Sequence, residues 1–315
     1  MTAVIIKNKK QDSLGWGKGI LISVLVLASS CASTKPTTSV SSPEVAEEIR
    51  EHMRQYVDIF NNEQAGQIAK EIYLAPVLTS ESAEQKLYAD LTEKDVREDF
   101  DDAFVAMKGN GWNRSVIHGI AVHPKGKDLA FIDMEFSRFK ANGETIPPAP
   151  KSWSYVLAKI EAGWRIISAH EQSAQAPPSP SQMMNEVKAH MTRYLGLFND
   201  GQAERIAKEI YLAPMQMRKF GDETHVVAST TEEIHTQFNA MFETIKSKGW
   251  ARSKLHGMDI RLGGNDLAFV DMRFSRLKNN GQPIPPAQRI ASYVLVKRPN
   301  GWRIVSVLGQ SPPTE

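Results

Sequence analysis

Two histidines, His118 and His256, occupy corresponding places in this 315-residue chain, 138 positions apart. Each stands in a strand-like run, SVIHGIAVH and SKLHGMDIR, on the alternating row that in the first run also holds Val116, Ile120 and Val122. This alternation predicts apolar surroundings for both histidines. A neutral imidazole there could act as a general acid or base. The alternative is a buried, hydrogen-bonded structural histidine.

Two carboxylates share the same spacing. Asp133 and Asp271 lie in LAFIDMEFSRF and LAFVDMRFSRL, on the opposite strand face from the apolar row of Ile132, Met134 and Phe136. That face either lines a cavity or is a pairing or solvent face, and the sequence leaves both interpretations open. A histidine and aspartate could act together only if both pointed into the same space.

Basic residues end the same strands. Arg138 and Arg276, with Lys140 and Lys278, could meet an anionic ligand or lie in solvent. Neither copy contains a metal-ligand spacing, a phosphate-binding glycine loop or a nucleophile motif. The sequence therefore predicts no metal and no cofactor, and it argues against a metalloenzyme, a kinase or a serine hydrolase.

The chain is a tandem duplication. The nonapeptide IAKEIYLAP occurs at 68–76 and 206–214, and the match extends without insertion from 52–172 to 190–310. The segment 174–182, AQAPPSPSQ, has the composition of a linker. We therefore expect two domains, at 44–173 and 183–311.

Within each copy, helical spacing of apolar residues precedes strand-like alternation. An amphipathic helix starts near Ser42-Pro43, the nonapeptide predicts a short second helix ending at Pro76 or Pro214, and a third aromatic helix follows. From Trp112 and Trp250 onward the period changes to two. The predicted fold class is α+β, with three helices followed by a curved antiparallel sheet of about four strands in each domain.

The segments QYVDIFNNEQAGQIA and RYLGLFNDGQAERIA, each followed by an aromatic helix, strands and GWRI, resemble the nuclear-transport-factor-2-like domains, also called SnoaL-like or cystatin-like cone domains. The resemblance covers about 44–172 and 183–311. It implies a cone with an internal cavity. The superfamily includes isomerases, dehydratases and cyclases, and also members that only bind or dimerise through their sheets, so the fold does not give the function.

In the ketosteroid-isomerase branch of this superfamily, a helix tyrosine five residues before an asparagine donates a hydrogen bond to the substrate oxyanion. Tyr56 with Asn61, and Tyr194 with Asn199, match that pattern. The resemblance thus implies hydrogen-bond donors in the cavity. A core tyrosine with a capped hydroxyl is the alternative.

The acids of that branch are missing here. Its protonated aspartate would fall near Ser154 and Ser292, and its base has no aspartate counterpart, although Glu81 lies nearby in the first copy. Steroid-type isomerisation is therefore not expected. The candidate catalytic residues are Tyr56, His118, Tyr194 and His256. The candidate ligand-binding residues are Tyr56, His118, Asp133, Ser154, Tyr194, His256, Asp271 and Ser292.

Residues 1–30 are interpreted as a signal peptide, with lysines before the apolar run ILISVLVLA at 20–28. This run is too short for a transmembrane helix, which needs about 20 residues. LASSC resembles a bacterial lipobox, so lipidation of Cys31 is expected, with 31–43 as a flexible tether. Ala32 resembles the outer-membrane sorting pattern, which implies the periplasmic face of the outer membrane. Ordinary cleavage after Ser30, giving a periplasmic protein, is the alternative.

Charge gives little reason to expect nucleic acid as a partner. Without residues 1–30, which hold four lysines and one aspartate, 34 basic and 35 acidic residues remain. Three functions stay open. The first is a noncatalytic module for a small apolar or peptide ligand, with the domains paired within the chain or in a homodimer. The second is a SnoaL-like or dehydratase-type enzyme using tyrosine and histidine. The third is an envelope scaffold.

Overall fold

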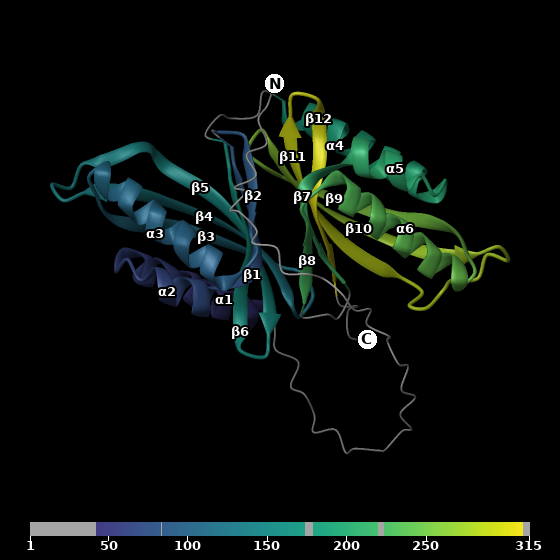
Figure 1. Cartoon of the computed structure of the whole chain (residues 1–315), viewed down its shortest axis with the longest axis horizontal. Helices are drawn as coiled ribbons and strands as arrows, with labels where there is room; N and C mark the ends of the chain where they lie inside the picture. Colours follow the sequence, from purple (N-terminus) through teal and green to yellow (C-terminus); the bar gives the residue numbers. More distant parts are fainter. Residues whose placement is uncertain (1–41, 83, 174–178, 220–223, 311–315) are drawn as a thin grey trace, which may run out of the picture.

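A computed structural model describes residues 42–82, 84–173, 179–219 and 224–310. The predicted signal peptide, the lipidation site Cys31 and the tether as far as residue 41 lie outside the described residues. Two similar domains stand side by side, with their sheets toward the middle and helices on the outer sides (Figure 1). None of the described helices is both long and apolar enough to cross a membrane.

The first domain contains α1 (Ser42–Asn61), α2 (Ala65–Gln67), the π-helical turn η1 (Ile68–Ile72), β1 (Tyr73–Glu81), β2 (Lys86–Asp90), α3 (Glu93–Gly109), β3 (Trp112–Pro124), β4 (Leu129–Lys140), β5 (Thr145–Ile160) and β6 (Gly163–Glu171). The second contains α4 (Pro180–Asn199), α5 (Ala203–Arg205), η2 (Ile206–Ile210), β7 (Tyr211–Arg218), β8 (His225–Ala228), α6 (Thr231–Ser247), β9 (Trp250–Gly263), β10 (Leu267–Lys278), β11 (Arg289–Arg298) and β12 (Gly301–Gly309). Helix α4 thus begins inside the segment predicted as the linker.

The long helices form because their apolar residues recur on one face. Ile49, Met53 and Tyr56 of α1 are buried against the inner face of the sheet. Helix α3 begins at a capping box, in which the Thr92 hydroxyl accepts from the Asp95 amide at 3.2 Å and the Asp95 carboxylate accepts from the Thr92 amide at 3.0 Å. Both long helices of each domain agree with the sequence prediction.

The prediction of a second helix across IAKEIYLAP is wrong. Only its first five residues are helical, as the turns η1 and η2, and Tyr73 or Tyr211 then starts a strand. Pro76 lies inside β1, where the pairing with β6 is irregular between Tyr73 and Leu78. A proline is tolerated at such a place because no regular ladder hydrogen bond is lost.

Within the described residues each sheet has six strands, in the orders β2-β1-β6-β5-β4-β3 and β8-β7-β12-β11-β10-β9. The α+β class with two tandem cone domains is confirmed, but the expected number of about four strands is too low. The sequence prediction missed β1 and β2 and their counterparts. Because β1 and β7 run parallel to β6 and β12, each sheet is mixed rather than antiparallel.

Both faces of the central strands are buried. In β4, Ala130 and Ile132 face the helices, whereas Leu129 and Phe131 belong to a cluster shared with the other domain. The two sheets meet through this cluster, which consists of Leu78, Leu87, Leu129, Phe131, Val156, Ala158, Ile167, Leu267, Phe269, Val294, Val296, Val305 and Leu308. The rings of Phe131 and Phe269 lie 5.0 Å apart at their centres. Burial of apolar area on both sheets stabilises the contact.

Polar groups at this contact are paired across it. Arg218 of β7 donates to Asp128 of the first domain at 2.9 Å, and Gln216 donates to the Ile167 carbonyl oxygen at 2.8 Å. The ring of His225 lies 2.6 Å from the Pro76 carbonyl oxygen. Such pairing matters because a buried charge without a partner is strongly destabilising.

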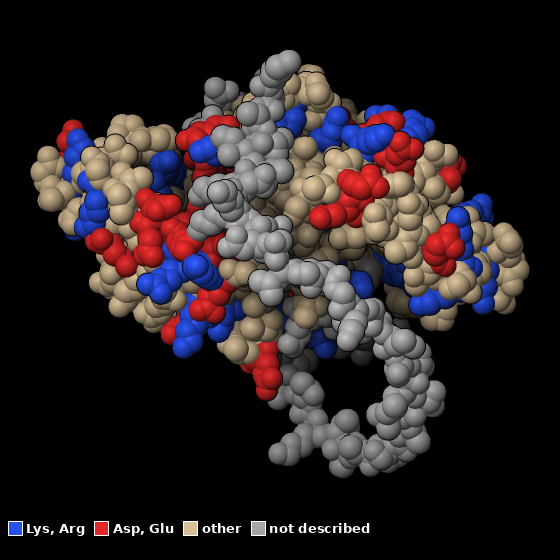
Figure 2. Space-filling view, viewed as in Figure 1, with Lys and Arg blue, Asp and Glu red and all other residues tan. Residues whose placement is uncertain are grey.

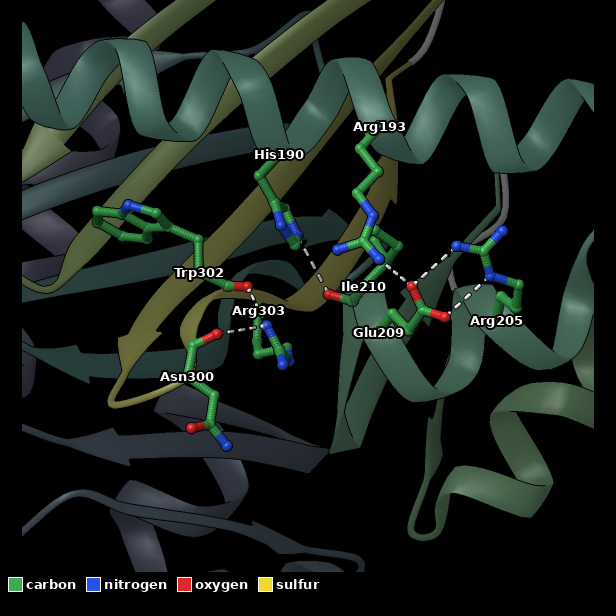
Figure 3. A network of polar contacts seen from close by, with 8 residues as sticks. All are labelled: His190, Arg193, Arg205, Glu209, Ile210, Asn300, Trp302 and Arg303. Atoms are coloured by element: carbon green, nitrogen blue, oxygen red, sulfur yellow. Dashed lines mark hydrogen bonds and ion pairs between the residues drawn. The ribbon is translucent and has the colours of Figure 1, made fainter.

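The repeated nonapeptide is anchored to its neighbours by polar side chains (Figure 3). In the second copy the His190 ring of α4 lies 3.3 Å from the Ile210 carbonyl oxygen. Glu209 of η2 accepts hydrogen bonds from Arg193 of α4 and Arg205 of α5. The π-helical turn is therefore held by two other segments of the same domain, α4 and α5.

One buried histidine makes the sheet contact sensitive to acid. His170 of β6 is fully buried between the hydroxyls of Ser80, 2.9 Å away, and Ser168, 3.1 Å away. Burial lowers the pKa of its imidazole from 6.5 to about 3. The unfolded chain therefore binds a proton below about pH 6.5 that the folded chain does not bind.

We predict that His170→Leu flattens the pH dependence of stability. Leucine occupies the corresponding position, 308, in the second domain. For the native chain the free energy of unfolding falls by about 1.4 kcal/mol per pH unit for this group as the pH drops from about 6 towards 4. Urea unfolding at several pH values measures the slope. The variant also loses the hydrogen bonds of both serines, which changes its free energy of unfolding equally at every pH and leaves the slope unaffected. An unchanged slope of the free energy of unfolding against pH would contradict the prediction.

Candidate functional site

Each domain encloses a cavity between its helices and the inner face of its sheet. The volumes are about 470 Å³ in the first domain and about 650 Å³ in the second. Both fall within the range of about 300–1,000 Å³ typical of small-molecule sites. Residues at corresponding positions line both cavities: Tyr56 and Tyr194, Phe60 and Phe198, Arg138 and Arg276, and Tyr155 and Tyr293.

The candidate tyrosines do line the cavities. The Tyr56 hydroxyl accepts a hydrogen bond from Tyr73 at 3.4 Å, and the rings of Tyr73 and Tyr155 stand edge-on to it. Burial raises the pKa of Tyr56, so its hydroxyl is neutral at physiological pH. Tyr194 has the same edge-on neighbours, Tyr211 and Tyr293.

The asparagines of the tyrosine–asparagine pattern have a structural role. Asn61 donates to the Ser115 carbonyl oxygen at 2.9 Å and accepts from the Ser115 amide at 2.7 Å. Asn199 makes the same two bonds to Ser253, at 3.1 and 2.7 Å. These bonds join the end of the first long helix to the first strand after α3 or α6, and so fix where the tyrosine points.

The predicted apolar surroundings of the histidines are wrong. His118 is exposed, and its Nε2 lies 2.7 Å from the Ser137 hydroxyl. The pairing of β3 with β4 shifts between Ile117 and Gly119, so Ile117, not His118, shares the inward row with Ile120.

His256 is placed in the same way. It is exposed, its Nε2 lies 2.7 Å from the Ser275 hydroxyl, and the pairing of β9 with β10 shifts at the same point. Neither histidine lines a cavity. The structure therefore does not bring Tyr56 together with His118, or Tyr194 together with His256.

Asp133 and Ser154 lie between the domains and not in a cavity. Asp133 accepts from Ser154 at 2.5 Å and from Gln172 at 3.1 Å, both in its own domain, and from Arg261 of the second domain. The Arg261 guanidinium also stacks on Phe269, with its carbon 4.2 Å from the ring centre. The sequence left open whether Asp133 lines a cavity or lies on a pairing or solvent face. The structure places it on the face between the two sheets.

Asp271 and Ser292 repeat this arrangement with a different cation. Asp271 accepts from Ser292 at 2.5 Å and from Gln310 at 3.0 Å, and from Lys125 of the first domain at 2.6 Å. Each aspartate is therefore held by a serine and a glutamine of its own sheet and by a cation from the other domain. The expectation that Ser154 and Ser292 mark an acid position in the cavity is wrong, because their side chains point to the opposite face of the sheet.

The first cavity contains charges of both signs. Glu81, Asp99 and Glu171 line it, together with Arg138 and Lys151. The Glu171 carboxylate lies 3.7 Å from the Lys151 ammonium. Burial lowers the pKa of Arg138, and the charge of Glu171 partly offsets this effect. Burial raises the pKa of Glu81. The Tyr88 hydroxyl donates to Asp99 at 3.2 Å.

The second cavity is more apolar, and all the charged side chains among its described lining residues are positive. Its described lining includes Arg218, Lys219, Lys248, Arg276 and Arg289, and no aspartate or glutamate. Arg218 is already paired with Asp128. The loop before β11 covers part of the cavity with the buried Ile284, whereas the corresponding residues of the first domain continue as β5.

Most cavity residues were not predicted as site residues. The exceptions are the two tyrosines, together with Glu81 and the arginines that the sequence showed as open possibilities. Comparison of the two copies contains a signal for these residues, because the copies differ there. Trp153 corresponds to Ala291, and Glu171 corresponds to Gly309. These are cross-strand partners that face the cavities.

We predict a measurable coupling between Asp133 and Arg261. Asp133→Ala leaves the Arg261 guanidinium without its carboxylate. A double-mutant cycle with Arg261→Met should therefore give a coupling energy of about 1–2 kcal/mol. This is below the value for a fully buried pair, because both side chains are about a quarter exposed. The cycle is measured by urea unfolding. The exposed pair Asp259–Arg273 is the matched control and should give less than about 1 kcal/mol. Equal coupling in the two pairs would refute the prediction.

Solved structures with the same fold are similar to single domains of this chain. One is an NTF2-like superfamily protein from Salmonella enterica, 21% identical, covering 43% of this chain and 95% of its own, with a TM-score of 0.33. Another is a domain of unknown function with a cystatin-like fold from Nostoc punctiforme, 18% identical, covering 43% of this chain and 81% of its own, with a TM-score of 0.36. A third is an NTF2-like protein with a cystatin-like fold from Novosphingobium aromaticivorans, 14% identical, covering 45% and 95%, with a TM-score of 0.35.

No curated protein matches the chain. One family pattern, described as NTF2-like protein (DUF6841), matches it twice, at residues 46–174 and 185–312. The two matches coincide with the two cone domains and together cover most of the sequence. The chain therefore belongs to the NTF2-like family DUF6841 and carries two tandem copies of its domain.

Proposed function

We propose that this protein is a noncatalytic binding module that takes small molecules into the cavities of its two cone domains. The observation that carries the proposal is the pair of ligand-sized cavities. Each is lined by aromatic side chains and contains one arginine, Arg138 or Arg276, whose buried Nε has no hydrogen-bond partner among the described residues. A few polar groups in a mainly apolar cavity are typical of a binding site.

The noncatalytic interpretation is supported by the positions of the candidate catalytic residues. An enzyme using Tyr56 and His118 needs both side chains within about 3 Å of one ligand atom or of a bridging water. Tyr56 faces the cavity, whereas His118 is exposed and is bonded to Ser137. Likewise, Tyr194 lines the second cavity, whereas His256 is exposed and is bonded to Ser275.

The proposal includes an intrachain pseudo-dimer. The apolar cluster between the sheets and the cross-domain bonds of Asp133 and Asp271 support it. Joining two pairing domains in one chain raises their effective concentration without any new contact. In this arrangement the outer faces of the sheets are used for pairing, and the inner faces remain available for ligands.

The proposed location is the periplasmic face of a bacterial outer membrane, through a lipid on Cys31. The support is the sequence alone: the apolar run at 20–28, the LASSC segment and the Ser/Thr/Pro-rich stretch that follows. A tethered module at that surface would meet small molecules in the periplasm.

We predict that Ala291→Trp narrows the second cavity. Ala291 is buried in β11 opposite Gly309, and tryptophan occupies the corresponding position, 153, in the first domain. The native chain should enhance the fluorescence of the neutral apolar dye N-phenyl-1-naphthylamine, and the variant should lose part of this enhancement because the indole occupies apolar space that the dye would use. Dye titration with both proteins measures the effect, and full enhancement in the variant would overturn the binding proposal for this domain.

His118→Ala and His256→Ala are the matched controls. Both histidines are exposed and outside the cavities, so these variants should bind the dye as the native chain does.

Native mass spectrometry of the purified chain tests catalysis. A co-purified molecule that the native chain converts chemically, and that Tyr56→Phe or His118→Ala leaves unconverted, would refute the noncatalytic interpretation.

We predict that Cys31→Ser releases the protein from the membrane fraction. The full chain expressed in a Gram-negative bacterium should carry a lipid adduct on Cys31, because its thiol is the only one in the sequence. Membrane fractionation and intact-mass measurement test this. An unlipidated chain starting at residue 31, equally soluble in both forms, would contradict the proposed anchor.

A further inference from the structure

The two cavities differ in charge at corresponding positions. Glu81, Asp99 and Glu171 of the first cavity correspond to Lys219, Gln237 and Gly309 of the second. Two more carboxylates line the first cavity: Asp90 corresponds to Ala228, and Glu84 corresponds to position 222, which lies outside the described residues. Four of the five cavity carboxylates are thus replaced by a neutral or a basic residue.

The surface around the first cavity follows the same trend. Acidic side chains gather on the first domain in the region of α3 and β2 (Figure 2). Helix α3 contains six acidic residues: Glu93, Asp95, Glu98, Asp99, Asp101 and Asp102. Helix α6 of the second domain contains three: Glu232, Glu233 and Glu243.

The described lining of the second cavity places no carboxylate with Arg276, whereas Glu171 lines the first cavity together with Arg138 and acts on the Arg138 pKa electrostatically. The described neighbours of Arg276 are neutral at physiological pH or apolar: Tyr194, Tyr293, the Met241 sulfur, 3.8 Å from a guanidinium nitrogen, and the Phe198 ring, 5.9 Å from the guanidinium carbon. The Arg276 Nε is buried without a partner among the described residues. A largely buried cation without a counter-charge is costly, so the arrangement favours an anion inside the cavity.

A second guanidinium adds to the positive charge. Arg289 donates to the carbonyl oxygens of Ile284, Pro285 and Pro286 at 2.9, 2.6 and 2.7 Å, which fixes the loop over the cavity. Burial, and then repulsion from Arg276, lower the pKa of Arg289 to about 10, so it remains protonated at neutral pH. Arg276 and Arg289 both line the second cavity, so the positive charges of their guanidiniums act on the same ligand.

The remainder of the second cavity is suited to an apolar body. Met217, Val226, Met241 and Ala291 replace Thr79, Tyr88, Ala103 and Trp153 of the first cavity. Methionine side chains adapt to irregular apolar ligands, and the change from tryptophan to alanine leaves space. The larger volume of the second cavity agrees with these replacements.

We propose that the second cavity binds an amphiphile with a single carboxylate head, and that this carboxylate takes beside Arg276 the place that Glu171 occupies beside Arg138. The inference rests on the proposed binding function and names the ligand class of one of its two sites. The apolar chain of the ligand lies among the methionines and phenylalanines of the cavity. Arginine suits this role because its guanidinium presents several donors to one carboxylate.

Titration calorimetry of the full chain with dodecanoate, dodecanol and dodecyltrimethylammonium tests the inference. Dodecanoate should bind at least about tenfold more tightly than dodecanol, and the cationic amphiphile should bind most weakly. Arg276→Met should reduce dodecanoate affinity to about the level of dodecanol, while leaving dodecanol binding unchanged. Ala291→Trp should weaken binding of both.

A second variant does not touch Arg276. Gly309→Glu supplies a carboxylate at the position of Glu171, so it should compete with dodecanoate and weaken it at least about tenfold. Gly309→Gln is its uncharged control and should weaken dodecanoate less. Urea unfolding of each variant shows that the fold is intact.

Several outcomes would overturn the inference. Equal affinity for dodecanoate and dodecanol in the native chain, or equal loss with Gly309→Glu and Gly309→Gln, would show that the charge of the head is not recognised. Binding of the neutral dye without binding of dodecanoate would reject the ligand class while leaving the proposed function intact. Failure of the dye and of all three amphiphiles would remove the proposed function itself.

Discussion

The burial of both faces of each sheet is the constraint on which the rest of the structure depends. A cone domain alone would expose the outer face of β4 or β10, where Phe131 and Phe269 stand. Pressing the two outer faces together removes this apolar area from water. The same contact also partly buries Asp133, Asp271 and the neighbouring cations, which must then be matched in position and charge. The cross-domain bonds of the two aspartates therefore make the alignment of the sheets specific.

This constraint acts differently on the two rows of each strand. Outward residues must fit another domain, and at the centre of the contact the two copies are similar, as with Leu129 and Leu267, whereas other outward positions differ, as with Leu78 and Gln216. Inward residues near the cavity must fit only a ligand or each other, and there the copies differ, as at Trp153 and Ala291. The two copies thus share the apolar centre of the contact and differ in their cavities.

The fold could be predicted largely from periodicity, because amphipathic helices such as α1 and alternating strands such as β4 have strong patterns. The segment IAKEIYLAP could not, since its apolar spacing is helical and Pro76 is an ordinary sign of a helix end, whereas pairing with β6 places its last four residues in a strand. Tertiary pairing decided the outcome there.

The candidate site was less predictable. A single-residue irregularity in β3 reverses the direction of His118, and the sequence pattern shows no sign of it because apolar residues stand on both sides. The partner of Asp133 is Arg261, which belongs to the other domain. No local pattern can indicate a contact of that kind. The tyrosines were found through the resemblance of their tyrosine–asparagine spacing to that of the ketosteroid-isomerase branch, and this spacing lies within one helix.

A duplicated cone could hold two identical sites, but the charges of the two cavities argue for two different ones. In the first cavity Glu171 lies near Lys151 and interacts with Arg138, so much of the charge is balanced within the chain. In the second, Gly309 leaves Arg276 without that balance. Because the cost of a buried charge depends on its nearest counter-charge, this difference supports the proposal that the second domain prefers an anionic ligand, whereas the first cavity has less need of one.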